Sequence, residues 1–210
     1  MGLASIQAYC SERKLELPAS AKDLCRALRS SLLRASNSRG IQETPADIYK
    51  RLKLLPEPPP QILEQLRARS LHERAFCILG GEKNQDRDHE RPHFKRSDGA
   101  WFDFSIVVRE RNKELELLAY DFEIRLPAGR GAPFLRFDLN LPEHANDERD
   151  LRCHLHPGSD DILVPAPMMT PSELLALFLE GLQFPEARRQ RSVTAFELRW
   201  YGETHALCKS

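Results

Sequence analysis

The sequence predicts an α+β protein, in which an N-terminal helical region is followed by a four- to five-stranded antiparallel meander sheet covered on one face by helices. Three observations predict this class. Apolar residues recur with helical spacing before residue 80, they alternate with polar residues between 102 and 155, and a helix-capping signal follows at Thr170. The chain therefore divides into a helical region (1–81), a polar loop (82–100) and a sheet with a capping helix at 170–183 (101–210).

Three helices are expected in the first region. Ser20 and Asp23 combine an N-cap hydroxyl with an acid three residues later, ahead of leucines spaced for one helix face. Thr44 is followed by a proline at the first helical position and starts a second helix, which we expect to continue to Leu55. A proline-rich stretch then interrupts the helical pattern. The third helix is expected over residues 61–79 and ends at a pair of glycines.

The hydrophobic period changes from 3.6 to 2 after residue 100. Four segments alternate apolar with polar residues and are joined by short links, which is typical of an antiparallel meander. They are 102–108, 118–126, 135–140 and 151–156. A fifth strand is expected over 192–201. The capping box Thr170-Pro171-Ser172-Glu173 starts the helix that we expect to cover the apolar face of the sheet.

Composition excludes several classes of protein. The 31 basic and 31 acidic side chains balance, which excludes a polycation built for bulk adsorption to nucleic acid or membrane. No apolar run is long enough to span a bilayer, so we expect no membrane partner. The five cysteines are scattered without a Cys-x-x-Cys motif, and no secretory signal is evident at the N-terminus. We therefore expect reduced thiols and a cytoplasmic location.

The neutral total conceals a charge asymmetry. Residues 1–75 hold 13 basic and 8 acidic side chains, whereas residues 101–165 hold 8 basic and 13 acidic ones. Such an asymmetry is expected of regions that dock on each other or on a protein partner, and also of a chain with one end that faces a polyanion.

A set of polar residues is predicted to share one face of the sheet, because residues two apart on a strand point to the same side. The set comprises Asp121, Glu123, Arg125, Arg136, Asp138, Asn140, Arg152, His154 and His156. Imidazoles beside carboxylates and guanidiniums supply the proton carriers and cations that phosphodiester cleavage needs. The catalytic candidates are His154, His156, Asp138, Arg152 and Arg136. The alternative is a solvated sheet face whose charges pair across strands.

Two histidines at positions i and i+2 of a strand are also a metal-ligand pattern. With Asp161, the stretch His154-Leu-His156 resembles the first motif of the cupin family, and that resemblance implies a transition metal held by these three residues. Cupins carry Glu where Asp161 stands and have a second motif that is missing here, so a cupin barrel is not expected. A different site with His144 or Asp138 as further ligands suits Zn, Mn or Fe.

The sequence does not support the other catalytic and nucleotide-binding motifs that we considered. His89-Glu90-Arg91-Pro92-His93 matches the spacing of a zinc-protease helix, but its proline is incompatible with a helix interior, so we interpret it as a loop. No phosphate-binding glycine loop, dinucleotide fingerprint or nucleophile elbow is found.

Basic side chains in the helical region are candidates for nucleic-acid binding. They are Lys22, Arg26, Arg29, Lys50, Arg51 and Lys53. Regularly spaced cations of this kind contact a phosphate backbone, and the alternative is the ordinary solvated face of an amphipathic helix.

Three hypotheses of function follow. The first is a phosphodiesterase or nuclease-like enzyme that acts on RNA or DNA through a histidine–carboxylate–arginine site on the open, solvated face of the antiparallel sheet. The second is a non-catalytic adaptor, or a subunit of a protein or nucleoprotein complex. The third, less favoured, is a metal-dependent enzyme that acts on a small molecule.

Overall fold

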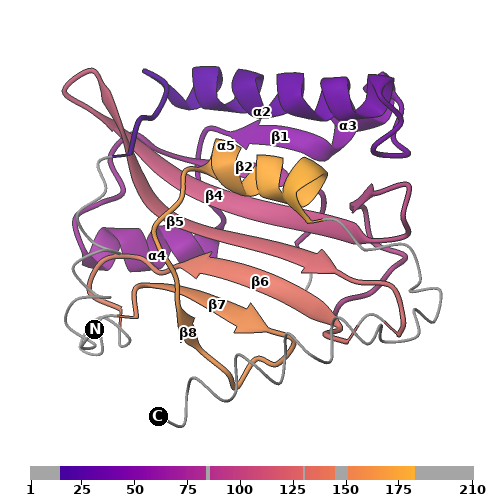
Figure 1. Ribbon diagram of the computed structural model, residues 1–210. Coiled ribbons are helices and arrows are strands. Elements are labelled where there is room, and N and C mark those ends of the chain that lie inside the picture. The colour runs from indigo at the N-terminus through magenta and orange to yellow at the C-terminus, as the bar shows by residue number, and fades with distance from the viewer. Residues whose placement is uncertain (1–14, 84–85, 130, 145–150, 183–210) are drawn as a thin grey trace, which may run out of the picture.

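The computed structural model describes residues 15–83, 86–129, 131–144 and 151–182 (Figure 1). Within these residues the protein is an α+β structure with an antiparallel sheet, as the sequence predicts. The helices are α2 (Ala21–Asn37), α3 (Pro45–Arg51), α4 (Pro60–Ala68), α5 (Pro171–Ala176) and the π-helical turn η2 (Leu177–Gly181). The strands are β1 (Leu52–Leu55), β2 (Ala75–Gly80), β3 (Phe94–Lys95), β4 (Trp101–Arg111), β5 (Glu114–Arg125), β6 (Phe134–Leu139), β7 (Cys153–Pro157) and β8 (Val164–Pro165).

The sheet has the strand order β1-β2-β4-β5-β6-β7-β8, with β3 also paired to β4. The predicted meander corresponds to β4, β5, β6 and β7, which pair in sequence order and antiparallel. The prediction of four to five strands is too low, because the described part of the sheet has eight. The strand predicted over 192–201 lies outside the described residues.

The helical region predicted over 1–81 contains two strands that sequence analysis assigned to helices. The second helix ends at Arg51 and not at Leu55, and the third ends at Ala68, before β2 begins. Strand β2 lies between β1 and β4 and is apolar almost throughout, so its sequence lacks the alternation that marks a strand with one wet face. An apolar run of this length is compatible with either a helix or a strand.

Gly80 does not cap a helix but ends β2 opposite Phe104. A Cβ atom at this position would lie 2.2 Å from the Phe104 ring, closer than any real contact. The glycine is therefore required by the close approach of an aromatic ring to the backbone of the neighbouring strand.

The N-terminal caps are as predicted. The Ser20 side chain accepts the backbone N–H of Asp23, and Thr44 and Thr170 each start a complete capping box. The helix expected over 170–183 consists of α5 and η2, which ends at Gly181. Arg96 stabilises the end of η2, because its guanidinium donates to the backbone oxygens of Phe178 and Leu182. No helix in the described residues is long and apolar enough to cross a membrane.

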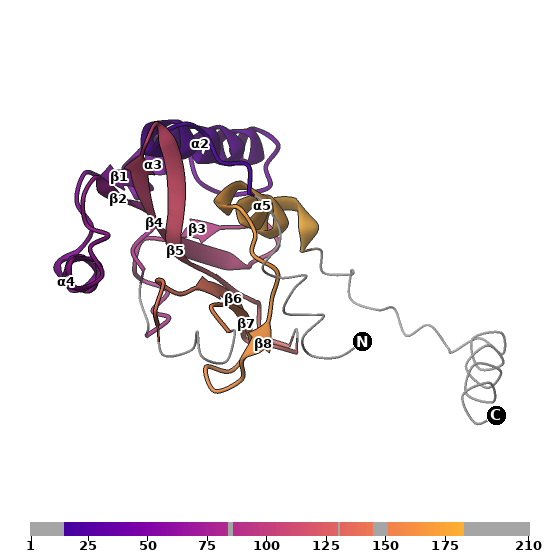
Figure 2. The ribbon, with the colours of Figure 1, turned by 90° about the vertical axis from the view of Figure 1, so that its left-hand side faces the viewer.

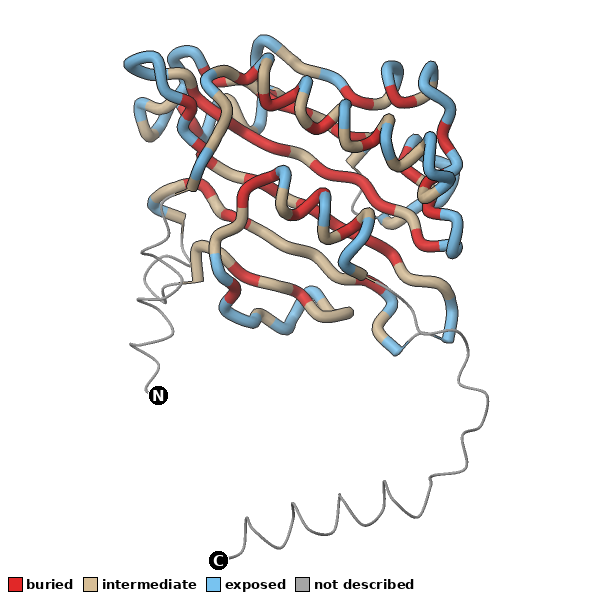
Figure 3. Tube along the Cα trace, turned by 45° about the horizontal axis from the view of Figure 1, so that its top comes forward, coloured by how far each residue is buried: buried red, intermediate tan, exposed pale blue. Residues whose placement is uncertain are grey.

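The two faces of the sheet are covered differently. Helices α2 and α5 pack on one face over the main core, where Phe102, Phe104, Phe122 and Phe178 are fully buried. Figure 2 shows α4 on the opposite side of the sheet from α5. Buried residues run along the central strands, as Figure 3 shows, because both faces of these strands are covered.

Helix α4 packs on the polar-facing side of the sheet through a second, smaller core. Leu66 of α4 contacts this cluster, which also contains Val107 and Leu118. The pairing of β4 with β5 shifts between Val107 and Val108, and this bulge turns Leu118 to the α4 side. The alternation predicted for the segment from 118 onward is therefore wrong at its first residue and correct from Tyr120.

Candidate functional site

Register places the predicted polar residues in two rows across the sheet. Asp121 of β5 lies opposite Asp138 of β6, which in turn lies opposite His154 of β7. One step along the strands, the second row comprises Asp103, Glu123, Arg136 and His156. The prediction that these side chains share one face is thus confirmed by the pairing, and Asp103 of β4 extends the face by one strand.

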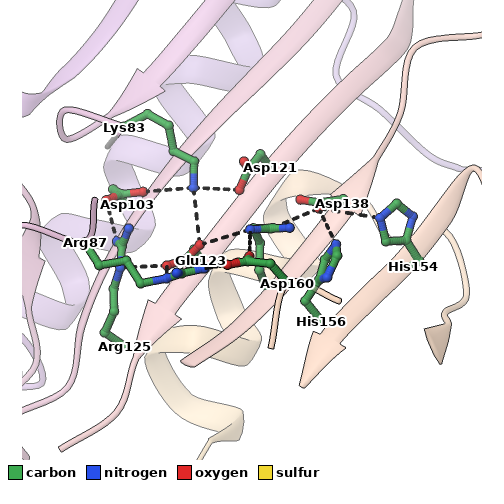
Figure 4. Close-up of polar contacts among 11 residues, drawn as sticks. Lys83, Arg87, Asp103, Asp121, Glu123, Arg125, Asp138, His154, His156 and Asp160 are labelled. Atoms are coloured by element: carbon green, nitrogen blue, oxygen red, sulfur yellow. Dashed lines mark hydrogen bonds and ion pairs between the residues drawn. The ribbon is translucent and has the colours of Figure 1, made fainter. Parts of the chain in front are cut away.

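The end of this face at β6 and β7 is a three-residue cluster, Asp138, His154 and His156 (Figure 4). The Nε2 atom of His156 lies 3.2 Å from Oδ2 of Asp138, and Nε2 of His154 lies 3.6 Å from the same oxygen. The ligand atoms of all three residues lie within 4.8 Å of one another. Two imidazoles therefore converge on a single carboxylate oxygen.

Burial and hydrogen bonding set the state of this cluster. Both imidazole side chains are almost inaccessible, at 3% for His154 and 5% for His156, whereas Asp138 keeps 14% of its side chain exposed. Burial acts to raise the pKa of Asp138, but the hydrogen bond with His154 and the charge of Arg136 together hold it below the usual range. Burial and then the charge of Arg136 lower the pKa of His156, although Asp138 opposes them.

Next to this cluster, Lys83 is surrounded by carboxylates. Its Nζ atom lies 2.8 Å from Asp121, 3.5 Å from Asp103 and 3.8 Å from Glu123. Burial raises the pKa of Asp121 to about 6, and the charge of Asp138 adds to this shift, while Lys83 opposes it. Arg125 completes the group, because its guanidinium pairs with Asp103 and Glu123 and lies over the Trp101 ring.

A further ion-pair chain joins two loops above the sheet. Arg87 pairs with Glu123 at 2.8 Å and with Asp160 at 2.8 Å. Arg136 of β6 pairs with Asp138 at 2.9 Å and also with Asp160. The loop after β2 and the loop after β7 therefore meet over the polar face.

Much of this face is buried, contrary to the expectation of an open, solvated surface. The buried side chains include Asp103, Glu123, Arg125, His154 and His156. Sequence reasoning missed Lys83, Arg87 and Asp160, which lie outside the alternating segments. The only signal for them is the charge excess of the strands that they face, since buried carboxylates require cationic partners.

Two cavities open on the polar side of the sheet. The smaller, about 360 Å³, is lined by Lys83, Arg87, Asp121, Glu123, Arg136, Asp138 and Asp160. The larger, about 1110 Å³, extends from Lys83 and Asp121 towards α3, α4 and the loop that precedes β3. Because Lys83 and Asp121 line both cavities, the two adjoin. The basic lining of the larger cavity consists of Lys50, Arg51, Lys53, Lys83, Arg91 and Lys95.

The predicted nucleic-acid-binding residues divide into two groups. Lys50, Arg51 and Lys53 line the larger cavity, although Arg51 is also held by Glu43 and by the backbone oxygen of His93. Lys22, Arg26 and Arg29 belong to α2, which packs on the other face of the sheet. There Arg26 pairs with Asp23, and Arg29 lies over the Tyr49 ring.

Three other predicted site residues lie outside the cluster. Arg152 donates to the backbone oxygens of Asn140 and Leu118. Asp161 is exposed, and neither it nor His144 belongs to the group of ligand atoms around Asp138 that is found among the described residues.

The rejected zinc-protease spacing is indeed not helical, and the rings of its two histidines, His89 and His93, lie 4.9 Å apart beside Trp101. Comparison of the chain with protein-family models, with curated proteins and with solved structures finds no match. The geometry and chemistry of the site are therefore what indicate its function.

Proposed function

We propose that this protein is a nucleic-acid-associated phosphodiesterase with a nuclease-like centre at Asp138, His154, His156 and Arg136. The observation that carries the proposal is the convergence of both imidazole Nε2 atoms on one carboxylate oxygen, beside a guanidinium and a cavity. This combination supplies groups that activate a nucleophile and neutralise charge on a phosphate.

The larger cavity supports a nucleic-acid substrate. Its rim carries the exposed cations Lys50 and Lys53, and Lys83 lies where it adjoins the smaller cavity. Spaced cations along a groove contact successive phosphates and supply most of the sequence-independent affinity for a nucleic-acid backbone. The larger cavity thus leads from α3 towards the histidine–carboxylate cluster, and its six Lys and Arg side chains outnumber its four carboxylates, of Asp47, Glu82, Glu90 and Asp121.

In the proposed reaction, water attacks phosphorus and the bond from phosphorus to one ester oxygen breaks. The attacking water loses a proton to the Asp138–His154–His156 cluster, and the departing oxygen takes up a proton from solvent water. Arg136 lies where it can neutralise the charge that develops on the non-bridging oxygens. Because the imidazoles are buried, the exposed edge of Asp138 is the point of the cluster that borders the cavity.

The proposal is tested by cleavage of labelled single- and double-stranded RNA and DNA, with a panel of divalent cations. We expect cleavage by the wild type, and a loss of more than 100-fold for His154→Gln and for His156→Gln. His72→Gln is the matched control, because this histidine is exposed, lies outside the cluster and lines neither cavity. Lys53→Glu should weaken substrate binding and reduce the salt dependence of that binding. The cleavage rate at saturating substrate should change little.

Absence of cleavage by the wild type under all conditions would reject the enzyme hypothesis and favour the alternative, an adaptor or complex subunit. Equal activity of the wild type and both cluster variants would reject the proposed centre.

A further inference from the structure

The spacing of the three side chains at the edge of the sheet matches the coordination shell of a transition-metal ion. Bonds of about 2.0–2.1 Å to imidazole nitrogen and carboxylate oxygen place ligand atoms about 3.3 Å apart on the corners of a tetrahedron. The two distances from Oδ2 of Asp138, 3.2 Å to Nε2 of His156 and 3.6 Å to Nε2 of His154, lie on either side of that value. Both distances from the carboxylate oxygen are therefore close to tetrahedral spacing, and all three ligand atoms lie within 4.8 Å of one another.

The hydrogen bond on the far side of His154 fixes which atom it offers. Its Nδ1 atom lies 2.7 Å from the backbone oxygen of Leu151, and a carbonyl oxygen only accepts, so Nδ1 carries the hydrogen. A neutral His154 then presents a lone pair at Nε2 towards Asp138. This lone pair is what Nε2 can offer to a cation bound beside the carboxylate. Metal-binding histidines are commonly oriented by such a bond to a backbone carbonyl.

The carboxylate has spare capacity for an ion. The Oδ1 atom of Asp138 is buried and has no hydrogen-bond partner among the described residues. A buried oxygen without a partner is costly, and the positive charge of a cation held at the neighbouring Oδ2 offsets part of that cost.

The smaller cavity gives an independent reason. Its lining holds four carboxylates, of Asp121, Glu123, Asp138 and Asp160, against three cations, of Lys83, Arg87 and Arg136. A phosphodiester that enters would face an excess of negative charge at the position of Asp138. A divalent ion bound there would make the local charge positive, and its remaining coordination positions would be open to a phosphate oxygen or to water.

We propose that Asp138, His154 and His156 bind one divalent first-row transition-metal ion, of the class Zn²⁺, Mn²⁺ or Fe²⁺, through Oδ2 and the two Nε2 atoms. Two imidazoles with one carboxylate suit these ions and disfavour Mg²⁺ and Ca²⁺, which prefer oxygen ligands throughout. Three protein ligands leave coordination positions open, as in catalytic sites. The proposal that the ion binds does not require the protein to be an enzyme. Any part of the ion in cleavage rests on the proposed function.

The full chain is first freed of metal with a chelator and then dialysed against Zn²⁺, Mn²⁺ or, without oxygen, Fe²⁺, each alone. Elemental analysis should find one ion per chain for at least one of these metals, and Mg²⁺ should not compete at a tenfold excess. Asp138→Asn, His154→Gln and His156→Gln should each weaken binding by more than tenfold. Asp161→Asn and His205→Gln are the matched controls, since neither residue is in the proposed ligand set, and each should bind as the wild type does.

X-ray absorption of the metal-loaded wild type does not depend on the variants being folded. The expected first shell has two imidazole nitrogens, at least one further oxygen and no sulfur. A shell that contains sulfur, or fewer than two imidazoles, would overturn the proposal, as would wild-type protein that folds and binds none of the ions stoichiometrically. Metal binding without any cleavage would instead refute the proposed function alone. Cleavage by wild-type protein that binds none of these ions stoichiometrically would refute this inference alone.

Discussion

Lys83 is the side chain whose removal should reveal most about the polar face. Its Nζ atom is the shared partner of Asp103, Asp121 and Glu123, at distances of 2.8 to 3.8 Å. At an effective dielectric constant of about 20, each of these pairs is attractive by about 4–6 kcal/mol. Desolvation of the ammonium group offsets much of that attraction. Asp103 and Glu123 keep Arg125 as a cationic partner when Lys83 is removed. Asp121 is therefore the carboxylate most affected by the loss of the lysine.

We therefore expect Lys83→Met to lower the free energy of unfolding by about 3 kcal/mol, the lower end of the range for breaking a buried ion pair. Urea denaturation at pH 7.5 measures it. The double variant Lys83→Met/Asp121→Asn should recover at least about 1 kcal/mol, because no unpaired charge then remains at that position. Lys53→Met, an exposed lysine of the adjoining cavity, is the control and should change stability by less than about 0.5 kcal/mol.

A loss below about 0.5 kcal/mol for Lys83→Met would refute this reasoning. So would a double variant that is simply the sum of two destabilisations, because the coupling between lysine and carboxylate is what the contacts require.

Three further predictions concern the scaffold. Burial lowers the pKa of His93 to about 4, so between pH 6.5 and 4 the unfolded chain binds more protons than the folded chain. The free energy of unfolding therefore falls as the pH falls, by up to about 3 kcal/mol. Urea midpoints measured at pH 7 and at pH 4.5 should differ less for His93→Gln than for the wild type. Gly80→Ala should destabilise by more than about 2 kcal/mol, because the new methyl group meets the Phe104 ring; unchanged thermal melting would contradict the close approach. Thr170→Ala should cost about 1 kcal/mol through loss of the cap on α5, and Thr170→Ser, which keeps the hydroxyl, should recover most of it.

The sequence predicted the strands that have one polar and one apolar face. The alternation around Phe104, Phe122 and Phe137 correctly indicated β4, β5 and β6, because one side of each strand packs in the core and the other carries polar groups. The same rule could not find β2, whose residues are apolar on both sides. It also could not place Leu118, since a bulge depends on the partner strand and leaves no mark in local composition.

The sequence predicted the residues of the candidate site that lie on the strands. It did not predict the loop residues that pack over them. Period-two spacing places Asp138, His154 and His156 on one face wherever the strands pair in order, so their proximity follows from the meander. Lys83 and Arg87 come from a polar stretch without periodicity, where nothing local indicates which strand each faces. Their positions depend on long-range charge pairing, which composition suggests only as an excess to be balanced.

Two different kinds of side chain cover the polar-facing side of the sheet. At one end, α4 covers Val107 and Leu118 with apolar side chains such as Leu66. At the other end, the cover consists of charged groups on two loops, although a buried ion pair often stabilises a fold no better than an apolar pair of similar volume. Stability alone therefore gives no reason for the second arrangement when the first is available on the same face. Carboxylates, cations and imidazoles around a cavity are groups that can supply binding and proton transfer, and this physical ground supports the proposal of a site at this end of the sheet.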